Sequence, residues 1–160
     1  MTTSSNHPNH CSTEAANRVE QQPAAIITVR PDAEILTQQQ LPYFVGISTA
    51  TAGSQDISMC LVAIPPGASA EPHFHLGYET AIYLIQGRVE TRYGPELANS
   101  VVNETGDFIF IPPGVLHQPR NLSPSEPAYA LVARNNPNEQ ENTVLYSPHQ
   151  PEDAAKQSQP

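Results

Sequence analysis

The stretch EPHFHLGYETAIYLIQG, residues 71–87, places two histidines two positions apart and a glutamate four positions after the second. Side chains alternate between the two faces of a β-strand, so His73 and His75 are expected to point the same way. Two imidazoles on one face are a natural pair of ligands for a divalent transition metal. The apolar run that follows Glu79 ends at Gly87, which indicates a second strand closed by a turn.

A second block, GDFIFIPPGVLHQPRN at residues 106–121, carries a third histidine, His117. The block begins with a short apolar run of strand type and continues through a Pro-Pro-Gly turn before it reaches this histidine. A lone His-x-His pair is weak evidence for a metal site. A third histidine behind another strand and turn strengthens the hypothesis that the chain holds a metal ion.

The middle of the chain is rich in short runs of β-branched and aromatic residues, which are separated by proline and glycine. No segment shows sustained helical periodicity. This pattern is typical of an all-β sandwich or barrel rather than of alternating strands and helices. The expected strands are residues 24–30, 44–49, 58–64, 80–85, 88–93, 107–111 and 128–134.

The chain has 160 residues, which suits one domain. Residues 1–22 and 147–160 are polar and contain no apolar run, so we expect disordered tails around a single domain at residues 23–146. Of the two cysteines, Cys11 lies in the first expected tail and Cys60 in an expected strand. A structural disulfide is therefore not expected.

The chain carries 16 acidic and 7 basic residues, which gives a net charge of −9. An acidic chain without a basic patch disfavours nucleic acids and anionic membranes as partners. The N-terminus shows no basic start followed by an apolar segment, and no apolar run approaches the length of a membrane span. We therefore expect a cytoplasmic protein whose partner is a small molecule.

Together, the two blocks resemble the paired motifs of the cupin family. In the first motif a glycine is followed, after five residues, by His-x-His, then by a glutamate and a further glycine, as here. In the second, a glycine is followed after five residues by Pro-x-Gly, then by a histidine and an asparagine, again as here. The matching positions are Gly67, His73, His75, Glu79, Gly87, Gly106, Pro112, Gly114, His117 and Asn121.

The resemblance implies the double-stranded β-helix, or jelly-roll, barrel of cupins, in which the two motifs face each other across the interior. It also implies that His73, His75, Glu79 and His117 hold one metal ion. One spacing departs from the family pattern, because seven residues, one more than usual, separate Glu79 from the next glycine. The usual alternative glutamate position is occupied by Thr80, so Glu79 is the acid available there.

This implied ligand set has a chemical logic of its own. Three neutral imidazoles and one carboxylate suit a divalent Fe, Mn, Ni, Cu or Zn ion, and ligand identity alone does not choose among these metals. Four protein ligands on an ion that prefers six leave two positions for water or substrate. Open coordination positions of this kind are typical of a metal site that performs chemistry rather than of a closed structural metal site.

Tyr83 is a candidate catalytic residue. If Glu79 points inward, Tyr83 shares its face of the strand and brings a phenol near the metal. There it would donate a hydrogen bond or a proton, with simple packing in the barrel as the alternative interpretation. We expect the charged residues of the 88–93 strand on the outer face, and Arg120 or Arg134 at a rim of the barrel, where either could bind a substrate phosphate.

The cupin fold hosts many functions, so the fold alone does not choose among them. We expect a small mononuclear metalloenzyme with dioxygenase-like oxidoreductase chemistry on a small organic substrate. A metal-dependent isomerase of a sugar or sugar phosphate is an alternative, because a bound metal can also polarise a carbonyl. A non-catalytic barrel that binds a small ligand or metal, and a purely structural barrel, also remain open. The resemblance further implies a homodimer formed through outer strands.

Overall fold

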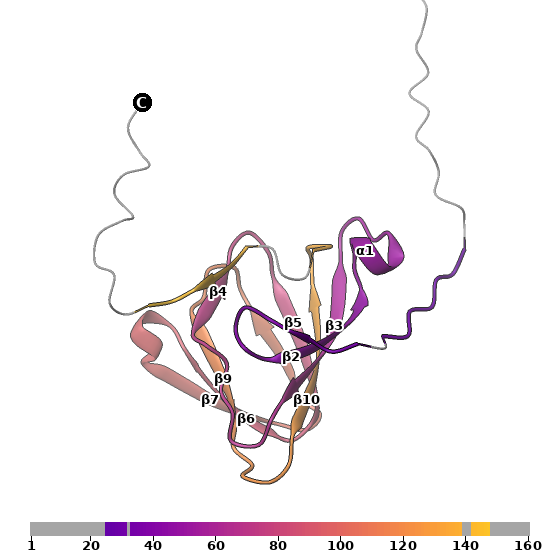
Figure 1. Cartoon of the computed structure of the whole chain (residues 1–160). Helices are drawn as coiled ribbons and strands as arrows, with labels where there is room; N and C mark the ends of the chain where they lie inside the picture. Colours follow the sequence, from indigo (N-terminus) through magenta and orange to yellow (C-terminus); the bar gives the residue numbers. More distant parts are fainter. Residues whose placement is uncertain (1–24, 32, 139–141, 148–160) are drawn as a thin grey trace, which may run out of the picture.

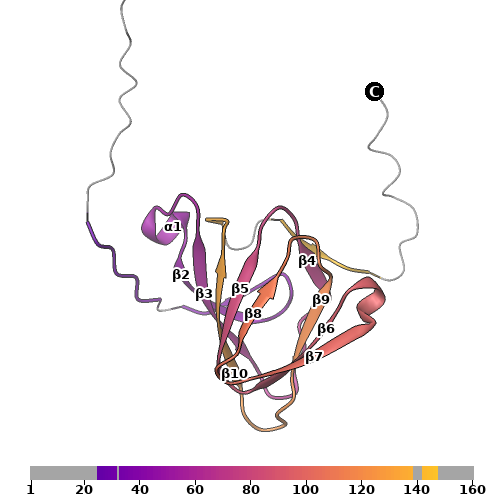
Figure 2. The same cartoon turned by 180° about the vertical axis from the view of Figure 1, so that it is seen from behind.

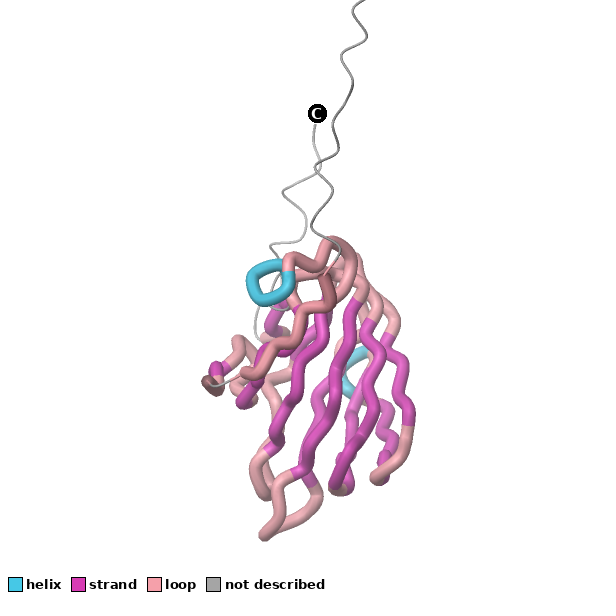
Figure 3. Tube along the Cα trace, turned by 90° about the vertical axis from the view of Figure 1, so that its right-hand side faces the viewer, coloured by secondary structure: helices cyan, strands magenta, loops and turns pink. Residues whose placement is uncertain are grey.

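The computed structural model describes residues 25–31, 33–138 and 142–147, which form two antiparallel β-sheets that face each other (Figure 1). The larger sheet has six strands in the order β1-β2-β3-β10-β5-β8, and the smaller has five in the order β11-β4-β9-β6-β7. In Figure 3 the strands run roughly along the length of the domain, and loops gather at its two ends. The all-β prediction is therefore confirmed.

The elements are bounded as follows. The six-stranded sheet contains β1 (Ile35–Leu36), β2 (Pro42–Ile47), β3 (Ser58–Ile64), β5 (Thr80–Gln86), β8 (Phe108–Ile111) and β10 (Ala128–Arg134). The five-stranded sheet contains β4 (His73–His75), β6 (Arg88–Tyr93), β7 (Asn99–Glu104), β9 (His117–Asn121) and β11 (Thr143–Leu145). Two short helices, α1 (Thr49–Ala52) and η1 (Pro95–Leu97), lie in connections between strands.

The strands β3 and β10 show how the sequence builds the core. In both strands, buried side chains alternate strictly with half-buried ones, and the two strands pair along their full length. Val62 and Val132 face inward from this pair and pack with Leu84 of β5 and Val89 of β6. Because Val89 belongs to the five-stranded sheet, the core fills the space between the two sheets.

Most of the expected strands are present. Those at residues 58–64, 88–93 and 128–134 are confirmed with unchanged bounds, and three others differ by one or two residues at their ends. The strand expected at residues 24–30 is wrong, because residues 25–30 form no strand and Ile26 is fully exposed. A β-branched run becomes a strand only where a neighbouring strand supplies hydrogen bonds, and this segment pairs with none of the described strands.

Two residues of the cupin-like motifs have architectural roles. Gly87 joins β5 to β6 with φ of 105°, and a Cβ at this position would lie 2.6 Å from the Cβ of Ala128. Only glycine satisfies both conditions. Asn121 is completely buried, and its side-chain amide donates to the carbonyl oxygens of Ile64 at 3.0 Å and of Glu126 at 2.8 Å. Asn121 therefore ties the end of β9 to the end of β3 and to the loop before β10.

The charged residues of β6 face outward, as expected. Arg88 forms an ion pair with Glu104 of β7 at 3.2 Å, and both side chains are exposed. None of the helices in the described part of the chain has the length and apolar character that a membrane-spanning helix requires. The tails expected at residues 1–22 and 147–160 lie outside the described residues, apart from Ser147.

Candidate metal centre

The strand β4 carries the two histidines of the first block. His73 and His75 are each about 3% exposed, whereas Phe74 between them is half-buried. This alternation places both imidazoles on the inner face of the five-stranded sheet, as the strand period predicts.

His117 begins β9, the strand beside β4, and lies directly opposite His73 in the antiparallel pair. Its side chain is buried as well. The turn before β9 is fastened to β4, because the Gly114 N–H donates to the carbonyl oxygen of His75 at 2.8 Å. Two blocks that are far apart in the sequence therefore bring their histidines to one place.

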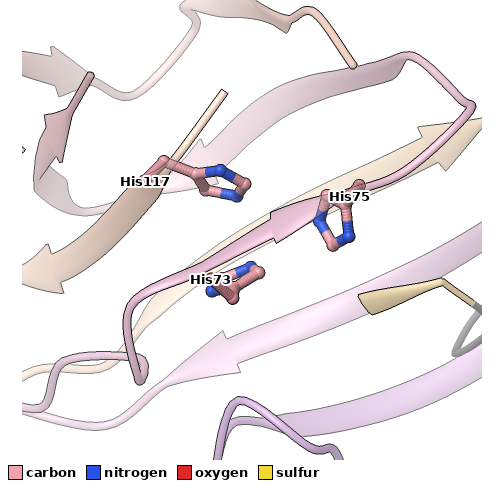
Figure 4. Close-up of side chains that lie close together, drawn as sticks. All are labelled: His73, His75 and His117. Carbon is pink, nitrogen blue, oxygen red and sulfur yellow. The ribbon is translucent and has the colours of Figure 1, made fainter. Parts of the chain in front are cut away.

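The three imidazoles converge in the space between the sheets (Figure 4). The ring centroid of His73 lies 5.0 Å from that of His75 and 4.3 Å from that of His117. One nitrogen from each ring can be chosen so that the three atoms lie within 4.8 Å of one another. This group is compact enough to hold one metal ion.

Hydrogen bonds at Nδ1 determine which nitrogen each ring presents. His73 Nδ1 lies 2.7 Å from the carbonyl oxygen of Glu71, and His117 Nδ1 lies 2.8 Å from that of Val115. A carbonyl oxygen only accepts, so each Nδ1 carries a proton and donates it. The Nε2 atoms of both rings are then left with free lone pairs, which is the state that a metal ion requires.

Tyr78 plays the corresponding part for His75. Its hydroxyl lies 2.9 Å from His75 Nδ1, and the two rings are stacked with centroids 5.1 Å apart. Thr143 of β11 lies 3.3 Å from the same nitrogen. Burial raises the pKa of the Tyr78 phenol, which therefore stays protonated at neutral pH. Tyr78 was not predicted from the sequence; when its hydroxyl oxygen accepts the proton of His75 Nδ1, Nε2 is again the nitrogen left for a metal.

Replacing Tyr78 with phenylalanine is expected to weaken metal binding by about tenfold to a hundredfold, because His75 loses the partner of its Nδ1. The ring would stay in place, so the fold should be unchanged. Competition with a chelator of known affinity measures this effect. Tyr83→Phe is the matched control, since Tyr83 lies outside the barrel, and it should bind metal as the unmodified protein does. Equal affinities in both variants would mean that the Tyr78 hydroxyl does not position His75.

Glu79 does not join the histidines. Its side chain is exposed, and its backbone N–H donates to Oδ1 of Asn135 at 2.7 Å. The next residue, Thr80, is 2% exposed and lines the cavity beside the three imidazoles. The structure therefore places Thr80, and not Glu79, on the inner face where a carboxylate ligand was expected.

Tyr83 also lies on the other face of β5 from the one expected. The inward residues of this strand are Thr80, Ile82 and Leu84, which all line the cavity. Tyr83 is 37% exposed and packs against Phe108 on the outer surface, with ring centroids 4.8 Å apart. The assumption that β5 turns its odd-numbered residues inward is wrong, so the structure lends no support to the catalytic role predicted for Tyr83, which stays an untested prediction.

A cavity of about 70 Å³ adjoins the histidines. Arg134, expected at the rim, is instead only 4% exposed and lines this cavity, where its Nη2 donates to the Tyr43 hydroxyl at 3.1 Å. Gln39, from the turn between β1 and β2, also lines it, and its amide nitrogen donates to the same hydroxyl at 2.8 Å. None of the described residues that line the cavity is acidic.

The surroundings keep the imidazoles neutral. Burial lowers the pKa of His73 from 6.5 to about 3, and the neighbouring His117 lowers it further. Burial lowers the pKa of His75 to about 2, with an added contribution from the positive charge of Arg134. Burial also lowers the pKa of His117. Neutral imidazoles are the form that binds a metal ion, so the donor atoms, their hydrogen bonds and their electrostatics all fit a divalent transition metal.

Residues 60–134 match the family described as Cupin domain, and this stretch contains all three histidines and both motifs. No curated protein matches the chain. The family match at residues 60–134 supports a small domain of the cupin superfamily, and the double-stranded β-helix fold predicted from the resemblance is confirmed.

Solved structures support the same fold. The polyketide cyclase RemF from Streptomyces resistomycificus is 22% identical with a TM-score of 0.62, and the match covers 76% of this chain and 85% of that one. An uncharacterized protein with a double-stranded beta-helix domain from Klebsiella pneumoniae is 19% identical, with a TM-score of 0.56 and coverage of 79% and 99%.

A further match is the oxalate decarboxylase of Lactobacillus farciminis in a formate complex, which is 24% identical with a TM-score of 0.59. The match covers 71% of this chain but only 33% of that protein, so the chain corresponds to about a third of its length. At these identities the similarity establishes the fold alone.

Proposed function

We propose that the barrel holds one divalent transition metal ion on the Nε2 atoms of His73, His75 and His117 and acts as a small mononuclear metalloenzyme. The observation that carries this proposal is the direction of the three imidazoles. Each Nδ1 has a hydrogen-bond partner on the protein side, and one nitrogen from each ring lies within 4.8 Å of the other two, so the three rings can offer their Nε2 atoms to one ion. The identity of the metal stays open among Fe, Mn, Ni, Cu and Zn.

The proposed reaction class is dioxygenase-like oxidation of a small organic substrate. A bound ion of this kind supplies Lewis-acid or redox chemistry at positions that the three imidazoles leave open. The chain itself contributes the hydroxyl of Thr80 and the guanidinium of Arg134, which face the same cavity and would orient oxygen atoms of the substrate. The apolar residues between the sheets exclude bulk water from these groups.

The alternative is an isomerase of a sugar or sugar phosphate. The buried donors beside the histidines would also suit a polarised carbonyl, which supports keeping this alternative. The cavity offers a phosphate group few positively charged partners, because Arg134 is the sole lysine or arginine among the described residues that line it. A non-catalytic barrel that binds a metal or small ligand is a third candidate with the same site.

Elemental analysis of protein purified without chelator or added metal tests the proposal directly, and about one transition ion per chain is expected. Oxygen uptake across a panel of small organic substrates then separates an oxidising enzyme from the isomerase, which consumes no oxygen. Metal without turnover of any substrate class would support the non-catalytic barrel. Protein that neither contains nor takes up a transition ion would contradict the proposed function.

We also propose that a second copy of the chain covers the outer face of the six-stranded sheet. β5 and β8 lie side by side at one edge of this sheet (Figure 2). Phe108 is 85% exposed, and Tyr83, Ile85 and Phe110 are exposed near it on the same two strands. An exposed apolar patch of this kind is typical of a protein–protein contact, and an equivalent patch on a second copy would match it.

Phe108→Asp is expected to raise the dissociation constant of this dimer by at least about thirtyfold, because a charge would enter the centre of the apolar contact. Analytical ultracentrifugation over a range of concentrations measures the change. The control is Val102→Asp, which introduces the same charge at an exposed valine on a strand of the other sheet. A dimer unaffected by Phe108→Asp would place the contact elsewhere.

A further inference from the structure

A second, larger cavity lies next to the one beside the histidines. The outer chamber has a volume of about 510 Å³ and lies among the end of β6, the start of β7, the end of β8 and the loop before β9. Four residues border both spaces: Thr91, Ile109, Ile111 and His117. The two spaces are therefore adjacent, and His117, one of the three residues that would hold the metal, borders both.

The cavity beside the histidines, which is the inner of the two adjacent spaces, carries polar groups among mostly apolar walls. Thr80 Oγ1 and Gln39 Oε1 are buried, and neither has a hydrogen-bond partner among the described residues. Buried polar atoms of this kind normally bond to protein, water or ligand, since leaving one unpaired is costly. A cavity of about 70 Å³ has room for about two waters or for a group of a few non-hydrogen atoms. This inner cavity thus suits a small head group that both donates and accepts hydrogen bonds.

The outer chamber carries fewer polar side chains. Its walls include Tyr93, Val101, Phe110 and Val115, and none of the described residues that line it is an acid, a lysine or an arginine. Val101 is 41% exposed, so apolar surface on this wall is open to solvent. A volume of about 510 Å³ lies within the usual range for pockets that bind small organic ligands.

We infer that the substrate has two parts: a compact head that carries oxygen atoms and binds at the histidines and Thr80, and an apolar body, such as an aromatic ring system, that fills the outer chamber. This inference rests on the proposed function, because the head would bind at the proposed metal. The metal site alone does not specify the size and polarity of the rest of the substrate, and the outer chamber supplies this information. A small, fully polar acid or sugar would leave the chamber walls exposed.

A series of hydroxamates tests this inference, because the probes share one metal-binding head and differ only in the body. Acetohydroxamate, benzohydroxamate and 2-naphthohydroxamate would each be titrated into protein loaded with Co²⁺, with the visible absorption of the cobalt as the readout. After correction for the affinity of each probe for free Co²⁺, 2-naphthohydroxamate is expected to bind at least about tenfold more tightly than acetohydroxamate. Equal affinities across the series would overturn the inference.

Two adjacent valines of β7 provide matched variants. Val101 lines the chamber and is 41% exposed, whereas Val102 is 40% exposed and does not line it. Val101→Trp should abolish most of the advantage of the naphthyl probe, and Val102→Trp should preserve it. An advantage that survives in both variants would place the body outside this chamber and would overturn the inference.

The cobalt content of the same samples tests the proposed function separately. Full cobalt occupancy without any preference for the naphthyl body would overturn the two-part substrate while leaving the metal site intact. Failure to bind cobalt, iron, manganese, nickel, copper or zinc would overturn both.

Discussion

Replacing His73 and His75 together with alanine is expected to reduce the bound metal from about one ion per chain to less than about a tenth of that. The double variant keeps only His117 of the three convergent imidazoles, and one imidazole does not retain an ion through purification. The β-rich circular dichroism spectrum should be preserved, because the core lies mainly on other strands. Metal content by elemental analysis is the measurement, and unchanged content would overturn the site.

Glu79→Ala is the matched control for this prediction. Glu79 belongs to the same motif in sequence, yet its side chain is exposed and outside the histidine group. The structure therefore leads us to expect that this variant keeps its full metal content. A large loss of metal in Glu79→Ala would mean that β5 shifts by one residue when the ion binds and turns the carboxylate inward.

The three histidines of the candidate site could be predicted from the sequence, whereas the position of Glu79 could not. The histidines could be predicted because His73 and His75 must share a face in any strand, whatever its neighbours are. His117 could be added because its spacing from the preceding turn matches the second motif. The direct pairing of His73 with His117 could not be derived from spacing, since it depends on how β4 and β9 align in the sheet.

The face of β5 could not be predicted for a specific physical reason. Both faces of this strand are apolar, because Ile82 and Leu84 point inward while Tyr83 and Ile85 lie on an exposed apolar surface. Alternation normally identifies the buried face, but it does so only when the other face is polar. Because β5 has no polar face, its inner face was predicted only from the expected inward position of Glu79. The structure turns that face outward, and Tyr83 lies on it.

Arg134 and Tyr78 illustrate two further limits. Arg134 continues the inward phase of β10, after Ala130 and Val132, so strand alternation alone pointed to its burial. A charged arginine is normally expected near solvent, at the rim of the barrel. Arg134 is buried instead, and its guanidinium donates a hydrogen bond to the hydroxyl of Tyr43 on β2. Tyr78 lies in the connection between β4 and β5, where no periodicity applies, and its contact with His75 depends on the shape of that loop.

Acid is expected to destabilise the metal-free protein in the pH range below about 6.5, because three buried histidines resist protonation in the folded state. The folded pKa is about 3 for His73 and about 2 for His75, mainly through burial, and that of His117 is also lowered. Since the unfolded chain binds these protons more readily, the stabilising effect is fully present above the unfolded pKa. It is lost as the pH falls toward the folded values, by up to about 1.4 kcal/mol per pH unit for each histidine.

Urea unfolding in the presence of chelator at about pH 7, 6 and 5 measures this dependence. A His73→Gln/His75→Gln variant provides the control, because glutamine does not titrate and the free energy of unfolding should then fall much less steeply with pH. Equal pH slopes for the two proteins would mean that these imidazoles accept protons without unfolding, and hence that they are more accessible to water than their burial indicates.

A bound metal ion should make the free energy of unfolding depend more strongly on pH. The ion binds only neutral imidazoles, so the free energy that it adds to folding is complete above about pH 6.5 and is lost on acidification. Thermal melting of metal-loaded protein, with and without excess chelator, should show a clear difference at neutral pH that closes as the pH falls. Protein that contains the ion but melts at the same temperature with and without chelator at neutral pH would hold the ion at another place. The three histidines would then be a buried, neutral cluster whose hydrogen bonds orient them for a metal that they do not bind.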